Sequence, residues 1–81
     1  MSEFETRVPR DPAQLASLRH MLSHWLERVG IADPPRADVV LATHEAAANA
    51  IEHSGASEPV VIRGQISDGA IAIQVSDRGG W

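Results

Sequence analysis

The chain begins with a short stretch in which apolar and polar residues alternate. In the range 3–8, one side of an extended backbone would carry Phe4, Thr6 and Val8, and the other side Glu5 and Arg7. A period of two residues is typical of a strand with one buried face. The pattern therefore predicts a β-strand over 3–8, and the proline that follows is expected to end it.

Two further alternating runs lie in the second half of the chain. The first covers 60–66 and the second covers 70–75, and Ser67, Asp68 and Gly69 separate them. An Asp-Gly pair between alternating runs is typical of a hairpin turn. These runs therefore predict two antiparallel strands joined as a β-hairpin.

Between the first strand and the hairpin, the hydrophobic period becomes helical. Asp11 followed by Pro12 predicts a helix start with Asp11 as N-cap, and Gln14 is placed to complete a capping box. Gly30 is expected to end this helix. Its apolar stripe consists of Leu15, Leu18, Leu22, Trp25, Leu26 and Val29.

A second helix is predicted from Asp33, again a cap followed by proline, to the Ser54-Gly55 pair. At about 100° of rotation per residue, it has two distinct flanks. The apolar flank consists of Val39, Val40, Ala46, Ala47, Ala50 and Ile51. The polar flank consists of Asp38, Glu45, Asn49, Glu52 and His53. We expect the apolar flank to face a core.

The order strand, helix, helix, strand, strand predicts the fold class. It favours an α+β two-layer sandwich in which both helices cover one face of a mixed, mainly antiparallel sheet. No internal repeat or linker composition interrupts this order. We therefore expect a single domain.

Composition narrows the range of functions. The 81 residues include 7 basic and 11 acidic side chains, a formal net charge of −4, and no cysteine. An acidic chain without a basic block is not expected to bind nucleic acid directly, and the lack of cysteine excludes disulfides and thiolate metal sites. Neither a membrane-spanning apolar run nor a signal peptide is present, so a cytoplasmic location without membrane attachment is expected.

The polar flank of the second helix has two interpretations. Asp38, Glu45 and Glu52 recur at every seventh position, as they would on an ordinary solvated face. Asn49 favours a functional interpretation, because asparagine is a poor helix former and its neutral oxygen suits a hard cation such as Mg²⁺. Glu45 lies one turn from Asn49, so the two side chains are neighbours.

A second motif follows the last predicted strand, where Asp77 and Gly79 form a D-x-G sequence. Together with E-x-x-x-N at Glu45 and Asn49, it resembles the N box and first glycine box of the superfamily of gyrase, heat-shock chaperone, histidine kinase and mismatch-repair ATPases. The phrase LATHEAAANAIEHSG and the ending VSDRGGW closely resemble bacterial anti-sigma-factor serine kinases. The cofactors implied by this resemblance are ATP and Mg²⁺.

The resemblance also implies roles for the helical pair. Glu45 would act as general base toward the attacking hydroxyl. Asn49 would bind the Mg²⁺ ion that bridges the nucleotide phosphates. The family often has histidine at the position of His53, which is expected mainly as a favourable charge near the helix C-terminus.

At the end of the chain, Asp77 would accept the adenine amino group, and Gly79 and Gly80 would let the backbone approach the nucleotide. Without Glu45 and Asn49 elsewhere in the chain, an ordinary Asx turn would be the favoured explanation of Asp77 and the two glycines. Trp81 stands where the family usually has a second glycine. Some members share the D-R-G-x-W ending of this chain. By this resemblance, Trp81 would cap the adenine pocket or pack beneath it.

The resemblance covers nearly all of residues 1–81, but only about the first half of a family domain. We therefore expect residues 1–81 to be the N-terminal part of one ATP-binding domain, without the lid and the second glycine box. Alone, this part is expected to lack kinase activity. The parent would sequester a sigma factor and phosphorylate an anti-anti-sigma protein. The alternative is a non-catalytic nucleotide-binding or protein-interaction module. The apolar last strand, with no partner on its outer edge, predicts a homo-oligomer.

The remaining histidines are expected to be structural or solvated. His20 and His24 have the spacing of a zinc pair on a helix, but they lie opposite the leucine stripe and no third ligand is evident. His44 borders the apolar flank of the second helix. We expect it to be packed or hydrogen-bonded.

Overall fold

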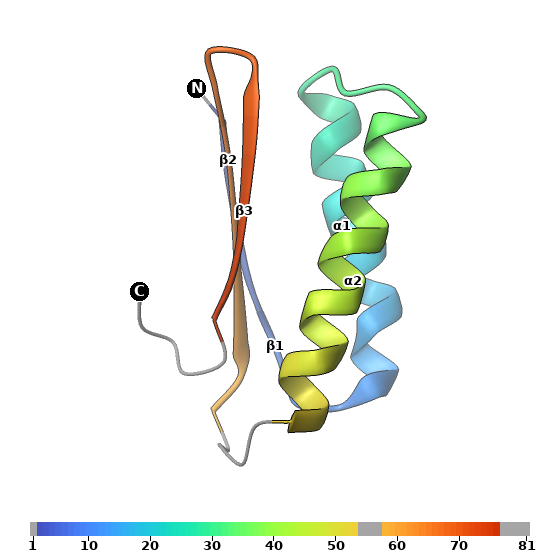
Figure 1. Cartoon of the computed structure of the whole chain (residues 1–81), viewed down its shortest axis with the longest axis vertical. Helices are drawn as coiled ribbons and strands as arrows, with labels where there is room; N and C mark the ends of the chain where they lie inside the picture. The colour runs from blue at the N-terminus through green and yellow to red at the C-terminus, as the bar shows by residue number, and fades with distance from the viewer. Residues whose placement is uncertain (1, 54–57, 77–81) are drawn as a thin grey trace.

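A computed structural model describes residues 2–53 and 58–76. Its elements, in chain order, are β1 (Ser2–Val8), the short 3-10 helix η1 (Pro12–Gln14), α1 (Leu15–Arg28), α2 (Pro35–His53), β2 (Val60–Ser67) and β3 (Ala70–Ser76). Figure 1 shows both helices on the same side of the strands. The predicted order of elements is confirmed.

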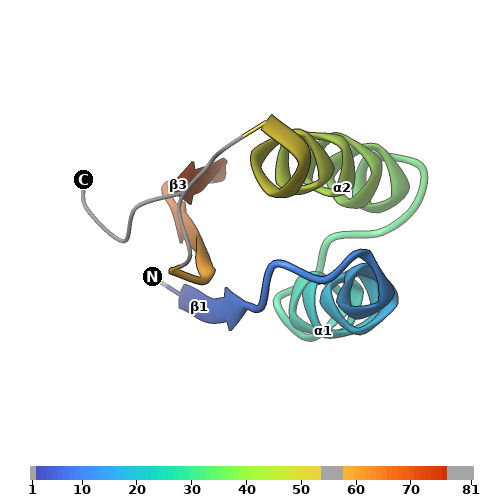
Figure 2. The same ribbon diagram turned by 90° about the horizontal axis from the view of Figure 1, so that it is seen from below.

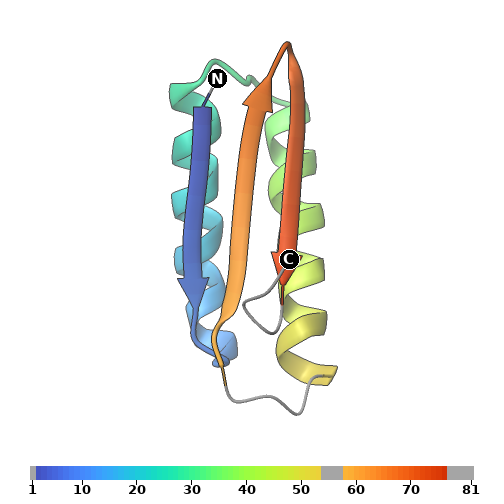
Figure 3. The same ribbon diagram turned by 90° about the vertical axis from the view of Figure 1, so that its left-hand side faces the viewer.

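The strands form one antiparallel sheet in the order β1-β2-β3. Viewed end-on in Figure 2 and face-on in Figure 3, the sheet is one layer and the helix pair is the other, on one face of the sheet. The register sets Phe4 opposite Gly64, and Gly64 opposite Ile73. The predicted α+β sandwich is confirmed.

The core lies between the sheet and the apolar stripe of α1. Leu22 and Leu26 have no exposed area, and neither has Ile62 on β2. The predicted stripe of α1 is buried apart from Val29, which is half-buried. Burying side chains of this size is the main favourable contribution to the free energy of folding.

Trp25 is packed against the middle of the sheet, where Gly64 leaves room for it. A Cβ atom added to Gly64 would lie 2.8 Å from the Trp25 ring. The indole Nε1 donates a hydrogen bond to Ser2 Oγ at 3.0 Å, and the ring lies 5.4 Å from that of Phe4, centroid to centroid. Gly64 is therefore needed for the close approach of α1 to the sheet.

The start of the first helical segment is partly as predicted. Asp11 caps η1 by accepting a hydrogen bond from the Ala13 N–H at 3.0 Å. The predicted capping box is wrong, because the Asp11 N–H donates to the Pro9 carbonyl at 2.7 Å and is not available to the Gln14 side chain.

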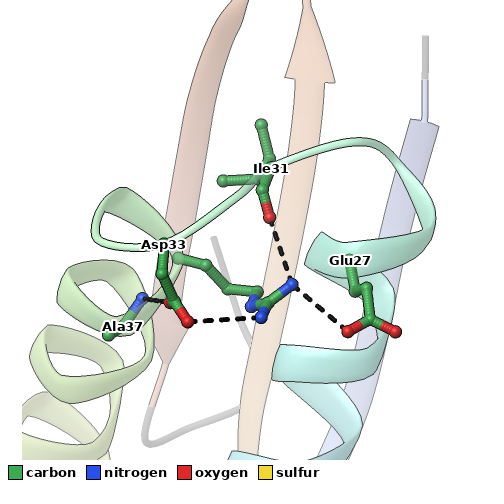
Figure 4. A network of polar contacts seen from close by, with 5 residues as sticks. Glu27, Ile31, Asp33 and Ala37 are labelled. Atoms are coloured by element: carbon green, nitrogen blue, oxygen red, sulfur yellow. Dashed lines mark hydrogen bonds and ion pairs between the residues drawn. The ribbon is translucent and has the colours of Figure 1, made fainter.

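Asp33 and Arg36 organise the connection between the helices. Asp33 Oδ1 accepts from the Ala37 N–H at 3.2 Å, although α2 begins at Pro35, one residue later than a cap at Asp33 predicts. Arg36 donates to Asp33 and Glu27, each at 3.3 Å, and to the Ile31 carbonyl at 3.4 Å (Figure 4). This network joins the end of α1 to the start of α2.

The buried flank of α2 is slightly rotated from the prediction. Ala47 is fully buried as expected, but Ala46 is exposed, and Thr43, which the pattern did not single out, is only 4% exposed. The reason is that Thr43 and Ala47 lie one turn apart along the line facing the core, whereas Ala46 lies to one side of that line, about 60° around the helix from Thr43 and about 100° from Ala47. The predicted residues Val39, Val40, Ala50 and Ile51 are half-buried.

Candidate functional site

The candidate site residues on α2 project from its outer flank. Glu45 and Asn49 are both exposed, as are Asp38 and Glu52. Within the described ranges, no hydrogen bond or ion pair involves the side chain of Glu45 or Asn49. The predicted pair therefore has its oxygen atoms available to a ligand.

Packing of α2 against the sheet brings its C-terminal turn to the end of β3. Both elements run in the same direction and end at the same end of the molecule (Figures 1 and 3). Ala50 and Ile51 of α2 pack in one cluster with Ile73 and Val75 of β3. The exposed residue Asn49 is next to Ala50 in sequence, so it lies near the end of β3.

The second predicted motif follows this strand end in the sequence. Asp77, Gly79, Gly80 and Trp81 lie outside the described residues. Their predicted roles toward adenine remain predictions. The structure shows that β3 ends at Ser76, just before this motif in the sequence. This strand end lies at the same end of the molecule as the C-terminal turn of α2.

The charge of the outer flank bears on what it can bind. Asp38, Glu45 and Glu52 give it three carboxylates, and the one cationic arginine of α2 is Arg36, held in the first turn by Asp33 and Glu27. A polyphosphate placed beside Asn49 would be repelled by the neighbouring carboxylate of Glu45. A divalent cation between them would offset that repulsion, so the residues present fit Mg²⁺ better than free nucleotide.

The described residues contain no cluster of three or more metal-binding side chains. A Mg²⁺ ion requires no such cluster, because it keeps several waters and is commonly held by substrate phosphates with one or two protein oxygens. Asn49 would supply one such oxygen. His20 and His24 are both exposed on α1, and the described part of the chain contains no third ligand beside them.

Two of the hollows on the described surface lie elsewhere. One, of about 640 Å³, covers the sheet face that the helices leave open, beside the ion pair between Arg63 and Glu5 at 2.8 Å. The other, of about 340 Å³, lies between the helices near Arg19 and Leu41. Neither is lined by Glu45 or Asn49. In the described part of the chain, Glu45 and Asn49 therefore lie on exposed surface outside these two hollows.

His44 is half-buried between the helices, as predicted. Its Nδ1 atom lies 3.1 Å from Arg19 Nη1 and accepts a hydrogen bond, because a guanidinium group can only donate. His44 thus joins α2 to α1 and does not face the flank of Glu45.

The pattern analysis missed Arg10, which lies between β1 and η1. Its guanidinium donates to the carbonyl oxygens of Ala50 and Glu58, each at 2.7 Å. Residue 10 belongs to no periodic pattern, and its partners are far away in sequence, so nothing in the sequence indicates this contact.

Comparison with known proteins gives one family. Residues 8–81, nearly the whole chain, match the family described as the Histidine kinase-like ATPase domain. None of the curated proteins compared with the chain matches it significantly. In the described part of the chain, neither helix is long and apolar enough to cross a membrane. The match of residues 8–81 means that this chain belongs to the histidine kinase-like ATPase domain family.

Proposed function

We propose that this chain supplies the N-box part of the ATP site of a protein serine kinase that acts as an anti-sigma factor. Family membership implies binding of ATP together with Mg²⁺. The observation that carries the proposal is the pair of exposed oxygen-bearing side chains, Glu45 and Asn49, one turn apart on α2, the helix whose C-terminal turn packs against β3. Neither has another described partner.

In this proposal each residue of the pair has one task. Asn49 would hold Mg²⁺, which neutralises the charge that develops on the phosphates during transfer. Glu45 would take the proton of a serine hydroxyl while the serine oxygen forms a bond to the γ-phosphorus. The bond between the γ-phosphorus and the β-phosphate oxygen would break at the same time, and ADP would leave. Asp77 would accept the adenine amino group, with Gly79, Gly80 and Trp81 around the base.

The proposed partners are a sigma factor, which the protein would sequester, and an anti-anti-sigma protein, which it would phosphorylate on serine. The protein would thereby regulate transcription without binding nucleic acid itself. The support is the resemblance of LATHEAAANAIEHSG to anti-sigma-factor kinases. A homo-oligomer is also proposed, on the evidence of the uncharged strand β3.

One observation favours a second candidate function. Glu45 and Asn49 lie on exposed surface and line neither of these two hollows. Such a surface also suits a non-catalytic nucleotide-binding or protein-interaction module, in which the chain pairs with another protein and transfers no phosphate.

Nucleotide binding and phosphate transfer by the full-length protein separate the candidates. Calorimetry should show Mg²⁺-dependent ATP binding that Asp77→Asn weakens and in which Asn49→Ala removes the metal dependence. Radiolabelled phosphate should move from ATP to the serine partner, and Glu45→Ala should abolish this transfer while sparing binding. Equal ATP affinity of the wild type and Asp77→Asn would end the assignment of Asp77, and binding without transfer would favour the module.

A further inference from the structure

Arg10 joins three parts of the chain that are distant in sequence. It lies two residues after the end of β1. Its Nη1 atom donates to the carbonyl of Ala50 in α2, and its Nε atom donates to the carbonyl of Glu58, two residues before β2. Both distances are 2.7 Å, which is short for a nitrogen donor. The contact with Ala50 is partly buried.

The bond to Ala50 acts on the C-terminal end of α2, the helix that carries Glu45 and Asn49. Ala50 is among the last four residues of α2, whose carbonyls have no acceptor role within the helix. A cation at this end is favourable because the carbonyl dipoles leave partial negative charge there. Arg10 thus provides the C-terminal turn of α2 with a partner from outside the helix.

The bond to Glu58 adds a second fixed point. The guanidinium keeps the Ala50 and Glu58 carbonyls at a fixed distance from each other, because its donors form a rigid planar fork. The end of β1, the end of α2, the start of β2 and the end of β3 all lie at this end of the molecule (Figures 1 and 3). Asn49 immediately precedes Ala50 in this turn.

We propose that Arg10 is a positioning residue of the nucleotide site. It fixes the last turn of α2, and with it Asn49, relative to the strand ends, without contacting the nucleotide itself. The inference rests on the proposed function, since it assigns Arg10 to the same Mg²⁺-ATP site. It predicts that the geometry of the fork matters and not only the positive charge.

Two substitutions separate these contributions. Arg10→Lys keeps the charge but offers a single point donor, which cannot hold two carbonyls in the same way. Arg10→Met keeps most of the apolar stem and removes both donors. Arg63→Met is the matched control, because Arg63 pairs with Glu5 on the open face of the sheet, the face opposite the helices.

The first readout is amide hydrogen exchange along α2, which needs no nucleotide. Arg10→Met should speed exchange in the last turn of α2 on the order of tenfold, with a smaller effect for Arg10→Lys and none for Arg63→Met. The second readout is ATP affinity with and without Mg²⁺. The ratio of the two affinities should fall on the order of tenfold in Arg10→Met and less in Arg10→Lys.

The outcomes are distinct for the two proposals. If the wild type binds no Mg²⁺-ATP, the proposed function fails and the positioning role fails with it, whatever amide exchange shows of the anchor. If the wild type binds and Arg10→Met keeps the wild-type Mg²⁺ ratio, positioning is wrong while the proposed function stands. If Arg10→Lys equals the wild type in both readouts, charge alone suffices and the fork has no role.

Discussion

Gly64 lies where the indole of Trp25 reaches the sheet. A methyl group at this position would meet the Trp25 ring at 2.8 Å and Ile73 Cδ1 at 3.1 Å. Contacts this short force a shift of α1 or of β3, because the ring is also held by its bond to Ser2. The residue at 64 therefore sets the spacing between the layers.

We expect Gly64→Ala to reduce the free energy of unfolding by about 1–3 kcal/mol, the usual cost of overpacking a core. Urea unfolding followed by circular dichroism measures it. In a Trp25→Phe background, the same substitution should cost less, because the smaller ring leaves room for the added methyl group. An unchanged midpoint for Gly64→Ala in the wild-type background would contradict the close packing.

At the candidate site, function and helix stability should oppose each other. Asn49 is exposed in the interior of α2 with no described partner, and asparagine is less favourable than alanine in a helix by roughly 0.5 kcal/mol. Asn49→Ala should therefore raise the melting temperature slightly while it removes Mg²⁺ dependence from ATP binding. Glu45→Ala serves as control, since glutamate is a good helix former and its loss should leave stability nearly unchanged. A loss of stability in Asn49→Ala would mean that this side chain has a structural role.

At the scale of the elements, side-chain contacts hold the start of α2. Asp33 accepts from the Ala37 N–H and also from Arg36, whose other donors reach Glu27 and the Ile31 carbonyl (Figure 4). The helix N–H groups of the first turn have no partner within the helix, so a side-chain acceptor there stabilises it.

Asp33→Ala should lower the free energy of unfolding by about 0.5–2 kcal/mol, the range for a lost helix cap. Glu27→Ala removes only the ion pair of Arg36 with an exposed carboxylate and should cost no more than about 1 kcal/mol. Thermal melts of the two variants side by side measure the difference. If Glu27→Ala proves as costly as Asp33→Ala, the ion network and not the cap holds the start of α2.

For the whole molecule, the two edge strands differ in their protection against other chains. β1 carries Glu3, Glu5 and Arg7, whereas β3 (Ala70–Ser76) has no charged residue and no proline. In the described part of the chain, β3 pairs with β2 alone. Charged residues on an edge strand oppose pairing with a further strand, so β3 is the edge open to it.

We expect the chain to self-associate through β3. Light scattering over a concentration series should show an oligomer that dissociates on dilution, with a melting temperature that falls at the same time. Ala72→Lys, which places a charge on the exposed side of β3, should weaken the association. Ala16→Lys, the same change on the exposed surface of α1, should not. A monomer with a concentration-independent melting transition would sink the idea.

The sequence alone determined the elements and their order. The alternation of Phe4, Thr6 and Val8 and the leucine stripe of α1 are local patterns, and each is confirmed by burial in the structure. The position of Glu45 and Asn49 on one exposed face of α2 was predicted from their spacing alone, because residues four apart share a helix face whatever the helix packs against. Even so, the rotation of α2 was predicted imprecisely, since small residues such as Ala46 and Ala47 do not mark a boundary.

Only the tertiary structure decided which distant residues meet. Arg10 binds the Ala50 and Glu58 carbonyls, Trp25 lies over Gly64, and Val61 is only 3% exposed although it points away from the helices. None of these follows from a period of two or of 3.6, because a period assigns a residue to a face but not to a partner on another element. Partners are set when the layers pack at high density, and there the space left by Gly64 and the reach of one guanidinium fix the fit.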